Sequence, residues 1–263
     1  MLANINGIHI AYSDKGTGTS LVFLHAFPLN RTMWAPQEAH LSRRFRIVTV
    51  DLRGHGESDA PLWHYSLEQY ADDINSLLDH LAIQRAVLIG LSMGGYVNFA
   101  FYKKYARRVQ GLVLADTRAA ADSAEARTGR FNLAQTAYRK GAGAVAEIML
   151  PKLLGATSIA ERPGIVRQVR HMIEACEVSG IVVDSMAMAE RLESMSLLPL
   201  IKCPTLVLVG EEDGTTPPSE ARLMAQEIPG ARLSVIPGAG HISNLEQPDL
   251  FNQEIAKFAE ELP

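Results

Sequence analysis

Cysteine is scarce in this chain of 263 residues, which contains only Cys176 and Cys203. The two lack CxxC spacing, so the sequence predicts neither a disulfide-linked scaffold nor a thiol redox motif. No group of histidines and cysteines has the spacing of metal ligands, and we therefore expect no metal and no cofactor. We predict that both thiols are free and buried in a protein of the reducing cytoplasm.

Long apolar segments and an excess of basic residues are also missing. No stretch reaches the roughly 18 uninterrupted apolar residues of a membrane-spanning helix, and the alternating residues of Met1–Gly16 are unlike a signal peptide. The formal net charge of −4 offers no basic surface to nucleic acid. With 47% hydrophobic and 21% charged residues, the composition is typical of a globular protein. We expect no membrane or nucleic-acid partner, and the oligomeric state stays open.

Short aliphatic runs alternate with helical segments along the chain. Runs that are apolar on both sides are typical of strands buried between two layers of helices. Leu67–Leu81 has apolar residues at helical spacing after the candidate N-cap Ser66, and Ile8–Tyr12 alternates like a half-exposed antiparallel strand. These patterns predict an α/β fold with a mostly parallel central sheet flanked by helices. The aliphatic runs are Leu21–Leu24, Ile47–Val50, Ala86–Ile89, Leu112–Leu114, Leu206–Val209 and Leu233–Ile236.

The strand pattern stops between Thr117 and Ser196, where the sequence is helical throughout. We interpret residues 117–196 as a helical cap inserted at one edge of the sheet, over the carboxyl ends of the strands, where ligands bind in open α/β sheets. Residues 1–116 and 197–263 then form the core domain. The expected breaks between the cap helices are Gly141, Gly143, Gly155, Pro163 and Gly180.

The pentapeptide Gly90-Leu91-Ser92-Met93-Gly94 joins a predicted strand to a helix-compatible segment. The pattern G-x-S-x-G at such a junction is typical of a sharp turn that holds a serine hydroxyl outside the sheet. The first backbone N–H groups of the following helix have no partner within it, so they are available to an oxyanion. Ser92 is therefore the candidate nucleophile.

A serine hydroxyl is a weak nucleophile at neutral pH and needs a base that a carboxylate holds in one tautomer. Two loops after later predicted strands carry such groups. The loop Gly210–Pro218 contains three acids, and the loop Pro237–His241 ends in a histidine. The candidate base is His241, and the candidate acids are Glu211, Glu212 and Asp213.

Five segments occur in the order and spacing of the α/β-hydrolase family, and nearly the whole chain resembles its small esterases and enol-lactonases. The segments are Leu24–Pro28, Asp51–Asp59, Gly90–Gly95, Gly210–Pro218, and Gly238–His241 followed by Glu246-Gln247-Pro248. The resemblance implies an α/β-hydrolase fold in which Ser92 is the nucleophile, His241 the general base and acid, and Asp213 its orienting partner. Asp116 occupies a position that some relatives use for the acid, and it stays an alternative.

The resemblance also implies an oxyanion hole made by the backbone N–H groups of Phe27 and Met93. Ala26 stands where the family more often has glycine, and a positive φ at this position would strain it by roughly 1 to 2 kcal/mol. We expect the nearby His25 and His55 to fix loops rather than to act as bases.

The candidate pocket residues come from two parts of the chain. Trp34 follows the oxyanion segment, and the cap contributes methionines at helical spacing. Such methionines are also ordinary core residues, and this alternative stays open. The tentative pocket residues are Trp34, Met149, Met186 and Met188.

We expect hydrolysis of small-molecule carboxylic esters, with activity falling on the acid side through an apparent pKa near roughly 6 to 7. The alternative is an enol-lactone hydrolase of aromatic catabolism, whose carboxylated substrate would need a basic group in the cap. Perhydrolysis as a side reaction and a ligand receptor with slow turnover also stay open. Dehalogenases and epoxide hydrolases are disfavoured because they need a carboxylate in place of Ser92. The cap arginines considered are Arg127, Arg130, Arg139, Arg167 and Arg170.

Overall fold

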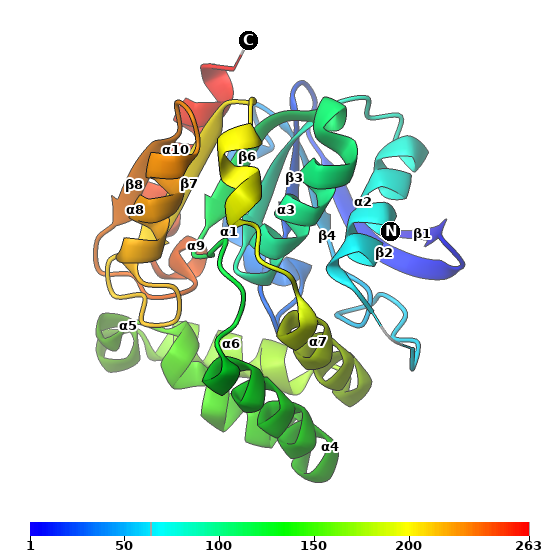
Figure 1. Ribbon diagram of the computed structural model, residues 1–263, viewed down its shortest axis with the longest axis vertical. Helices are drawn as coiled ribbons and strands as arrows, with labels where there is room; N and C mark the ends of the chain where they lie inside the picture. The colour runs from blue at the N-terminus through cyan, green and yellow to red at the C-terminus, as the bar shows by residue number, and fades with distance from the viewer. Residues whose placement is uncertain (64, 263) are drawn as a thin grey trace.

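An eight-stranded sheet lies at the centre of the computed structural model, which describes residues 1–63 and 65–262 (Figure 1). The strand order is β1-β2-β4-β3-β5-β6-β7-β8. β2 is antiparallel to β1 and β4, whereas all pairs from β4 to β8 are parallel. The strands are β1 (Leu2–Ile5), β2 (Ile8–Lys15), β3 (Ser20–Leu24), β4 (Arg46–Val50), β5 (Ala86–Leu91), β6 (Val109–Ala115), β7 (Thr205–Gly210) and β8 (Arg232–Ile236).

Every residue of β3, β5 and β7 is buried, because helices cover both faces of these central strands. β8 lies at the edge of the sheet and exposes part of its length. All six aliphatic runs lie within strands, so that prediction is confirmed. β1 was not predicted, because its four residues are too short for a clear alternating pattern.

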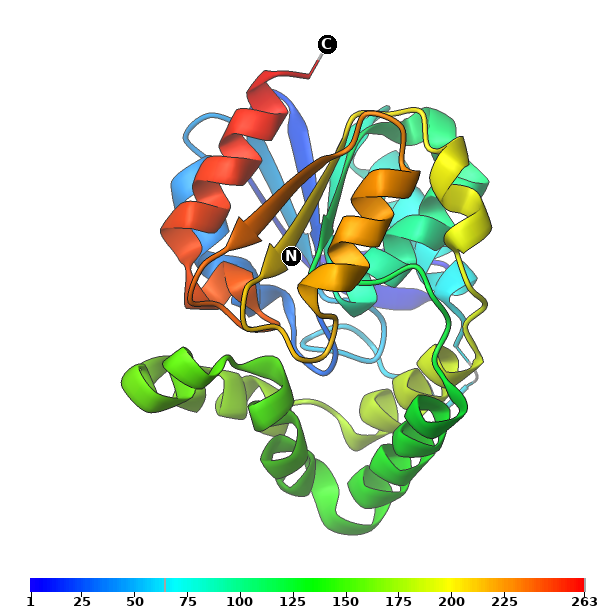
Figure 2. The same cartoon turned by 60° about the vertical axis from the view of Figure 1, so that its left-hand side comes forward.

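Two groups of helices form the outer layers, one on each face of the sheet (Figure 2). One group is α1 (Ala35–Leu41), α9 (Ser243–Glu246) and α10 (Pro248–Glu260), and the other is α2 (Leu67–His80), α3 (Met93–Tyr105) and α8 (Pro218–Glu227). The short 3-10 helices η1 (Arg31–Trp34) and η2 (Ala106–Arg108) precede α1 and follow α3. The predicted N-cap of α2 is confirmed, since the Ser66 hydroxyl accepts a hydrogen bond from the Gln69 N–H.

Four helices and one 3-10 helix lie between β6 and β7 in the chain, and the four helices extend beyond one end of the sheet (Figure 1). They are α4 (Ala124–Leu153), α5 (Ala156–Glu161), α6 (Pro163–Glu174), α7 (Val178–Glu190) and η3 (Met195–Leu200). β6 and β7 pair side by side in the interior of the sheet, so the segment leaves from between neighbouring strands and not from an outermost strand. The division into a core and a cap at residues 117 and 196 stays a prediction.

The helix breaks of this segment were predicted in part. Gly141 has a φ of 78° and bends α4 into two arms (Figure 2), and Gly155 and Pro163 lie at helix boundaries. Gly143 and Gly180 lie inside helices, so these two predictions were wrong. A Cβ on Gly180 would lie 1.9 Å from the carbonyl oxygen of Gly54, so glycine lets α7 pack closely against a core loop.

Of the helices within residues 1–63 and 65–262, none combines the length and the apolar character needed to cross a membrane. Both cysteines are free, as expected, but only Cys176 is fully buried, whereas Cys203 is half-buried.

Candidate active site

Ser92 lies between β5 and α3 with an unusual backbone conformation, φ 54° and ψ −109°. Its N–H donates to the Ala115 carbonyl at 2.9 Å, and its carbonyl accepts from the Thr117 hydroxyl at 2.8 Å. A positive φ is uncommon in a residue with a Cβ and persists only where the surroundings fix it. Both bonds come from the last residue of β6 and from the second residue after it, and they hold the turn in this conformation.

The glycines around Ser92 are required by close backbone packing. A Cβ on Gly90 would lie 2.2 Å from the Gly94 carbonyl oxygen, and a Cβ on Gly94 would lie 2.2 Å from the Leu24 carbonyl oxygen. A Cβ on Gly95 would lie 2.5 Å from the Thr117 hydroxyl oxygen. The glycines of this motif therefore bring the start of α3 against β3 and β5, which places the serine at the end of the sheet.

His241 follows β8 and is almost fully buried, with its ring between Ser92 and Asp213. Its Nε2 lies 2.8 Å from the Ser92 Oγ, and its Nδ1 lies 2.8 Å from Asp213 Oδ2. The His241 N–H donates to the Leu153 carbonyl of α4 at 3.1 Å. The Glu246 carboxylate accepts from the Gly240 and Gly155 N–H groups, both at 2.9 Å, so it ties the histidine loop to the segment 117–196.

Asp213 lies in the loop after β7, where three neighbouring groups besides His241 hold its carboxylate. Oδ1 accepts from the N–H groups of Thr215 at 2.8 Å and Thr216 at 2.9 Å. Oδ2 accepts from the Thr216 hydroxyl at 2.7 Å. Of the three candidate acids only Asp213 reaches the histidine; Glu212 instead accepts from the Thr157 N–H at 3.0 Å.

The charges of Asp213 and His241 shift both pKa values in the direction of an ion pair. Burial favours the neutral carboxyl, but the charge and hydrogen bond of His241 outweigh it and hold the pKa of Asp213 below its ordinary 3.8. Burial also favours the neutral ring, but the charge and hydrogen bond of Asp213 outweigh it and raise the pKa of His241 above 6.5. The carboxylate thus stabilises a positive charge on the ring.

Asp116, the alternative acid, has other partners. Its Oδ1 accepts from the Gly210 N–H at 2.8 Å, and its Oδ2 accepts from the Ser243 hydroxyl at 2.5 Å. Burial, followed by the charge of Asp213, raises the pKa of Asp116 well above its ordinary value. Asp116, which follows β6, therefore links the end of β7 to the start of α9 instead of hydrogen bonding to His241.

His25 holds the segment Ala26–Phe27, which contains one of the two predicted oxyanion donors. Its Nε2 accepts from the Leu52 N–H at 3.0 Å, so its Nδ1 carries the proton and donates to the Ala26 carbonyl at 2.9 Å. Burial lowers the pKa of His25 to about 4, which agrees with this neutral form. Among the residues that the structure describes, the non-glycine residues with positive φ are Asn6, Ala82, Ser92 and Asp116, so Ala26 carries no such strain.

The N–H groups of Phe27 and Met93 are the two predicted oxyanion donors. Within the described ranges, neither donates to a protein acceptor. Met93 is the first residue of α3, so its N–H has no partner in the helix. Phe27 lines the same cavity as Ser92.

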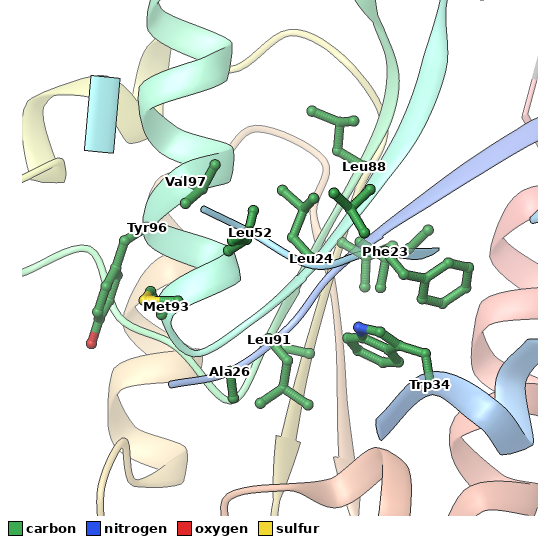
Figure 3. Close-up of a cluster of buried hydrophobic side chains, with 14 of the residues drawn as sticks. Phe23, Leu24, Ala26, Trp34, Leu52, Leu88, Leu91, Met93, Tyr96 and Val97 are labelled. Carbon is green, nitrogen blue, oxygen red and sulfur yellow. The ribbon is translucent and has the colours of Figure 1, made fainter. Parts of the chain in front are cut away.

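A cavity of about 670 Å³ lies between the core loops and the segment 117–196. Ser92, His241 and Phe27 line it from the core, and Met149 and Met188 line it from α4 and α7. Two pocket predictions were wrong. Trp34 is fully buried behind the sheet, with its ring centre 5.0 Å from that of Phe23 (Figure 3), and Met186 lies on the exposed side of α7.

A group of arginines beside this cavity was only partly predicted. The buried Asp122 carboxylate accepts from Arg118 at 2.6 Å, Arg130 at 2.6 Å and Arg191 at 3.0 Å. Arg118 and Arg130 line the cavity, whereas Arg170 pairs with Glu147 at the surface. Arg130 was among the predicted cap arginines, whereas Arg118, Asp122 and Arg191 were not predicted. The signal for Arg118 and Asp122 was their position just after the buried parallel strand β6.

A family model described as alpha/beta hydrolase fold matches residues 19–248. The chain belongs to this family. The expected fold class, an α/β-hydrolase with a mostly parallel sheet flanked by helices, is thereby confirmed.

Relatives of this α/β-hydrolase include both esterases and enol-lactonases. 3-Oxoadipate enol-lactonase 2 of Acinetobacter baylyi is 30% identical over 236 residues, which cover 90% of this chain and 86% of the relative. A thermophilic esterase from Thermogutta terrifontis, solved with malate bound, is 41% identical with a TM-score of 0.96, covering 99% of this chain and 98% of that one. The enol-lactonase from Burkholderia xenovorans is 33% identical with a TM-score of 0.93, covering 99% and 100%. The chain is therefore an esterase- and enol-lactonase-like hydrolase.

The described part of this α/β-hydrolase contains no candidate metal site made of acidic, histidine and cysteine side chains. Among residues 1–63 and 65–262, no three of them are grouped so that they could hold an ion.

Proposed function

We propose that this α/β-hydrolase is a serine hydrolase that cleaves carboxylic esters of small molecules. Ser92 is the nucleophile, His241 the general base and then the general acid, and Asp213 the partner that orients the ring. The observation that carries the proposal is the hydrogen-bond series from the Ser92 Oγ through both nitrogens of His241 to Asp213 Oδ2, each bond 2.8 Å long. It lies at the wall of a cavity large enough for a small ester.

The Asp213 carboxylate favours the tautomer in which Nδ1 of His241 carries the proton. The Nε2 lone pair then faces the Ser92 hydroxyl and removes its proton as Oγ attacks the ester carbonyl carbon. The former carbonyl oxygen becomes an anion, which accepts from the N–H groups of Phe27 and Met93.

Collapse of this tetrahedral intermediate breaks the bond to the alcohol oxygen, which takes the proton from His241 Nε2. The acyl group is left on the Ser92 Oγ. Water then loses a proton to His241 and attacks the acyl-enzyme, and the ring returns that proton to the Ser92 oxygen as the carboxylic acid leaves. The positive charge that forms on the ring in each half-reaction is stabilised by Asp213.

A second candidate function is hydrolysis of a lactone that bears a free carboxylate. The guanidinium groups of Arg118, Arg130 and Arg191 surround the single carboxylate of Asp122, which leaves positive charge in excess. Arg118 and Arg130 line the cavity with Ser92, so a substrate carboxylate could bind there. The identity to the Acinetobacter enol-lactonase supports this alternative.

A panel of substrates on the purified protein tests both candidates. We expect wild type to hydrolyse p-nitrophenyl acetate and butyrate, and Ser92→Ala to lose at least about 10⁴-fold in kcat. If the lactone is the better substrate, a carboxylated enol-lactone has a higher kcat/KM than the p-nitrophenyl esters. Arg118→Met then lowers kcat/KM for the lactone far more than kcat/KM for p-nitrophenyl acetate. Equal rates for wild type and Ser92→Ala would overturn the proposal, and binding without turnover would support the receptor alternative.

The small-molecule ester or lactone is the only partner we propose, and no cofactor is needed for these steps. We also propose a cytoplasmic location, which the two free thiols support. Fractionation of cells that express the protein tests the location.

A further inference from the structure

A second cavity, of about 640 Å³, lies beside the first, between α2, α3, α7 and η3. The proposed ester hydrolysis uses none of the residues that line only this cavity. Much of its wall is apolar, with side chains from all four elements. Apolar and aromatic residues that line it include Leu67, Phe99, Ala100, Ala187, Leu197 and Leu200.

Tyr96 is the residue that lines both cavities. It lies about one helical turn beyond Ser92 on α3, and only 5% of it is exposed. Figure 3 shows its ring next to Met93, on the side of α3 turned away from Leu24 and Leu88 of the sheet. The ring therefore stands between the cavity that contains Ser92 and the second cavity.

Arg191 fixes this ring from the side of the second cavity. Its guanidinium carbon lies 3.9 Å from the centre of the Tyr96 ring. Nη1 of Arg191 donates to the Ala120 carbonyl at 2.8 Å, and Nη2 donates to Asp122 Oδ1 at 3.0 Å. Arg191 lines the second cavity, and Arg118 and Arg130, which share Asp122 with it, line the first. Because Arg191 is held at both ends of its guanidinium group, the ring cannot move toward the second cavity without breaking these contacts.

We propose that Tyr96 is the end wall of the substrate site and sets the greatest length of substrate group that the site accepts. This inference rests on the proposed ester hydrolysis. A chain that extends from Ser92 along α3 stops at the ring in the wild-type protein. If the ring is removed, the two cavities become continuous, and the same chain can extend past the flat face of Arg191 into apolar surroundings.

Tyr96→Ala tests the wall, and Tyr96→Phe is its matched control because it keeps the ring. We measure kcat/KM for p-nitrophenyl acetate and p-nitrophenyl decanoate. In Tyr96→Ala the decanoate-to-acetate ratio is expected to rise by about tenfold or more, since each buried methylene group favours binding by about fourfold. In Tyr96→Phe the ratio stays within about twofold of wild type. An unchanged ratio in Tyr96→Ala, or the same rise in Tyr96→Phe, would overturn the proposal.

Ala100→Phe then tests where the longer chain goes. Ala100 lies one helical turn beyond Tyr96 and lines only the second of the two cavities. Added to Tyr96→Ala, the larger side chain occupies the space behind the removed ring, so the ratio is expected to return to within about threefold of wild type. A gain that persists in the double variant shows that the decanoyl chain lies elsewhere, and the proposal fails.

Binding to Ser92→Ala proteins separates this inference from the proposed function. By calorimetry, decanoate is expected to bind Ser92→Ala/Tyr96→Ala about tenfold more tightly than Ser92→Ala alone, while acetate shows no such difference. If decanoate binds the double variant more tightly but wild type hydrolyses no ester, only the proposed function is contradicted. If wild type hydrolyses acetate esters but neither the decanoate affinity nor the decanoate-to-acetate ratio changes, only the end-wall role of Tyr96 is contradicted. If Tyr96→Ala does not fold, Tyr96→Leu replaces it with the same expected direction.

Discussion

In the core, the loops after β5, β7 and β8 hold Ser92, Asp213 and His241 through backbone hydrogen bonds and close glycine contacts. The segment 117–196 instead contributes helix side chains to the cavity wall, and the positions of these side chains depend on where each helix packs. Around Gly94 the core leaves no space for a single added carbon, whereas nothing lies within 4 Å of a Cβ on Gly143 of α4. The core therefore fixes the geometry of the reaction, and the inserted helices shape the space in front of it.

Because the core loops hold the groups of the proposed reaction, the largest loss of activity is expected for Asp213, the acid that contacts His241. Asp213→Asn is expected to lower kcat for p-nitrophenyl acetate by about 10³- to 10⁴-fold, because an amide no longer favours the tautomer that accepts the Ser92 proton. Asp116→Asn is the control, since Asp116 bonds to Gly210 and Ser243. We expect it to lower the melting temperature while kcat stays within about threefold. A large loss of kcat in Asp116→Asn with little loss in Asp213→Asn would reverse the assignment.

Glycine substitutions test the difference in packing between the two regions. Gly94→Ala is expected to destabilise the protein by about 1 to 3 kcal/mol, because its Cβ would lie 2.2 Å from the Leu24 carbonyl oxygen. Gly143→Ala is expected to stabilise it by about 0.5 to 1 kcal/mol, because alanine favours the helix and has open space there. Urea titration of both variants measures the free energies of unfolding. A comparable loss in both would mean that the inserted helices are packed as tightly as the core.

The pH dependence tests the charge environment of the histidine. The base must be neutral, so activity is present above the pKa of His241 and is lost as the pH falls through it, by about tenfold per pH unit. Because Asp213 raises that pKa, the inflection of kcat/KM is expected above 6.5. The residual activity of Asp213→Asn should show an inflection at lower pH. A flat profile from about pH 5 to 8 would exclude His241 as the base.

The smallest effect is expected in the inserted helices themselves. Met188→Ala enlarges the cavity and is expected to change KM for p-nitrophenyl butyrate by a few-fold, with kcat nearly constant. Met186→Ala is the matched control on the same helix, since this side chain faces solvent. Steady-state kinetics of both variants measure the difference. Equal changes in KM would show that position on α7, and not contact with the cavity, decides the effect.

The parts of the site that could be predicted are those with a local signature. Ser92 and its glycines lie within six residues, and their spacing at a strand-to-helix turn identifies them. Asp213 follows the buried strand β7 and His241 follows the edge strand β8, and the carboxyl ends of parallel strands meet at the same end of a sheet. Five of the six confirmed aliphatic runs are buried along their whole length, and such a run needs no distant partner to be recognised as a strand, whereas the sixth lies in the partly exposed edge strand β8.

The errors concern residues whose role depends on distant packing. Trp34 packs against Phe23 (Figure 3) and against Phe251, which lies far along the chain on α10. Met186 and Met188 lie on the same helix, and only their contacts decide that one faces solvent and the other the cavity. Gly180 was predicted as a helix break, but it lies within α7, where glycine allows the close approach of the Gly54 backbone.

The sequence by itself determined which segments form six of the strands, the sharp turn at Ser92 and the loops that carry Asp213 and His241, because short-range patterns specify each of them. Only the tertiary structure decided that His241 meets Asp213 and not Asp116, that Arg118 joins Arg130 beside Asp122, and that Tyr96 stands between two cavities. These arrangements bring together side chains that are distant in the chain, and they depend on how α4 and α7 pack over the ends of the strands. Local propensity contains no information about that packing.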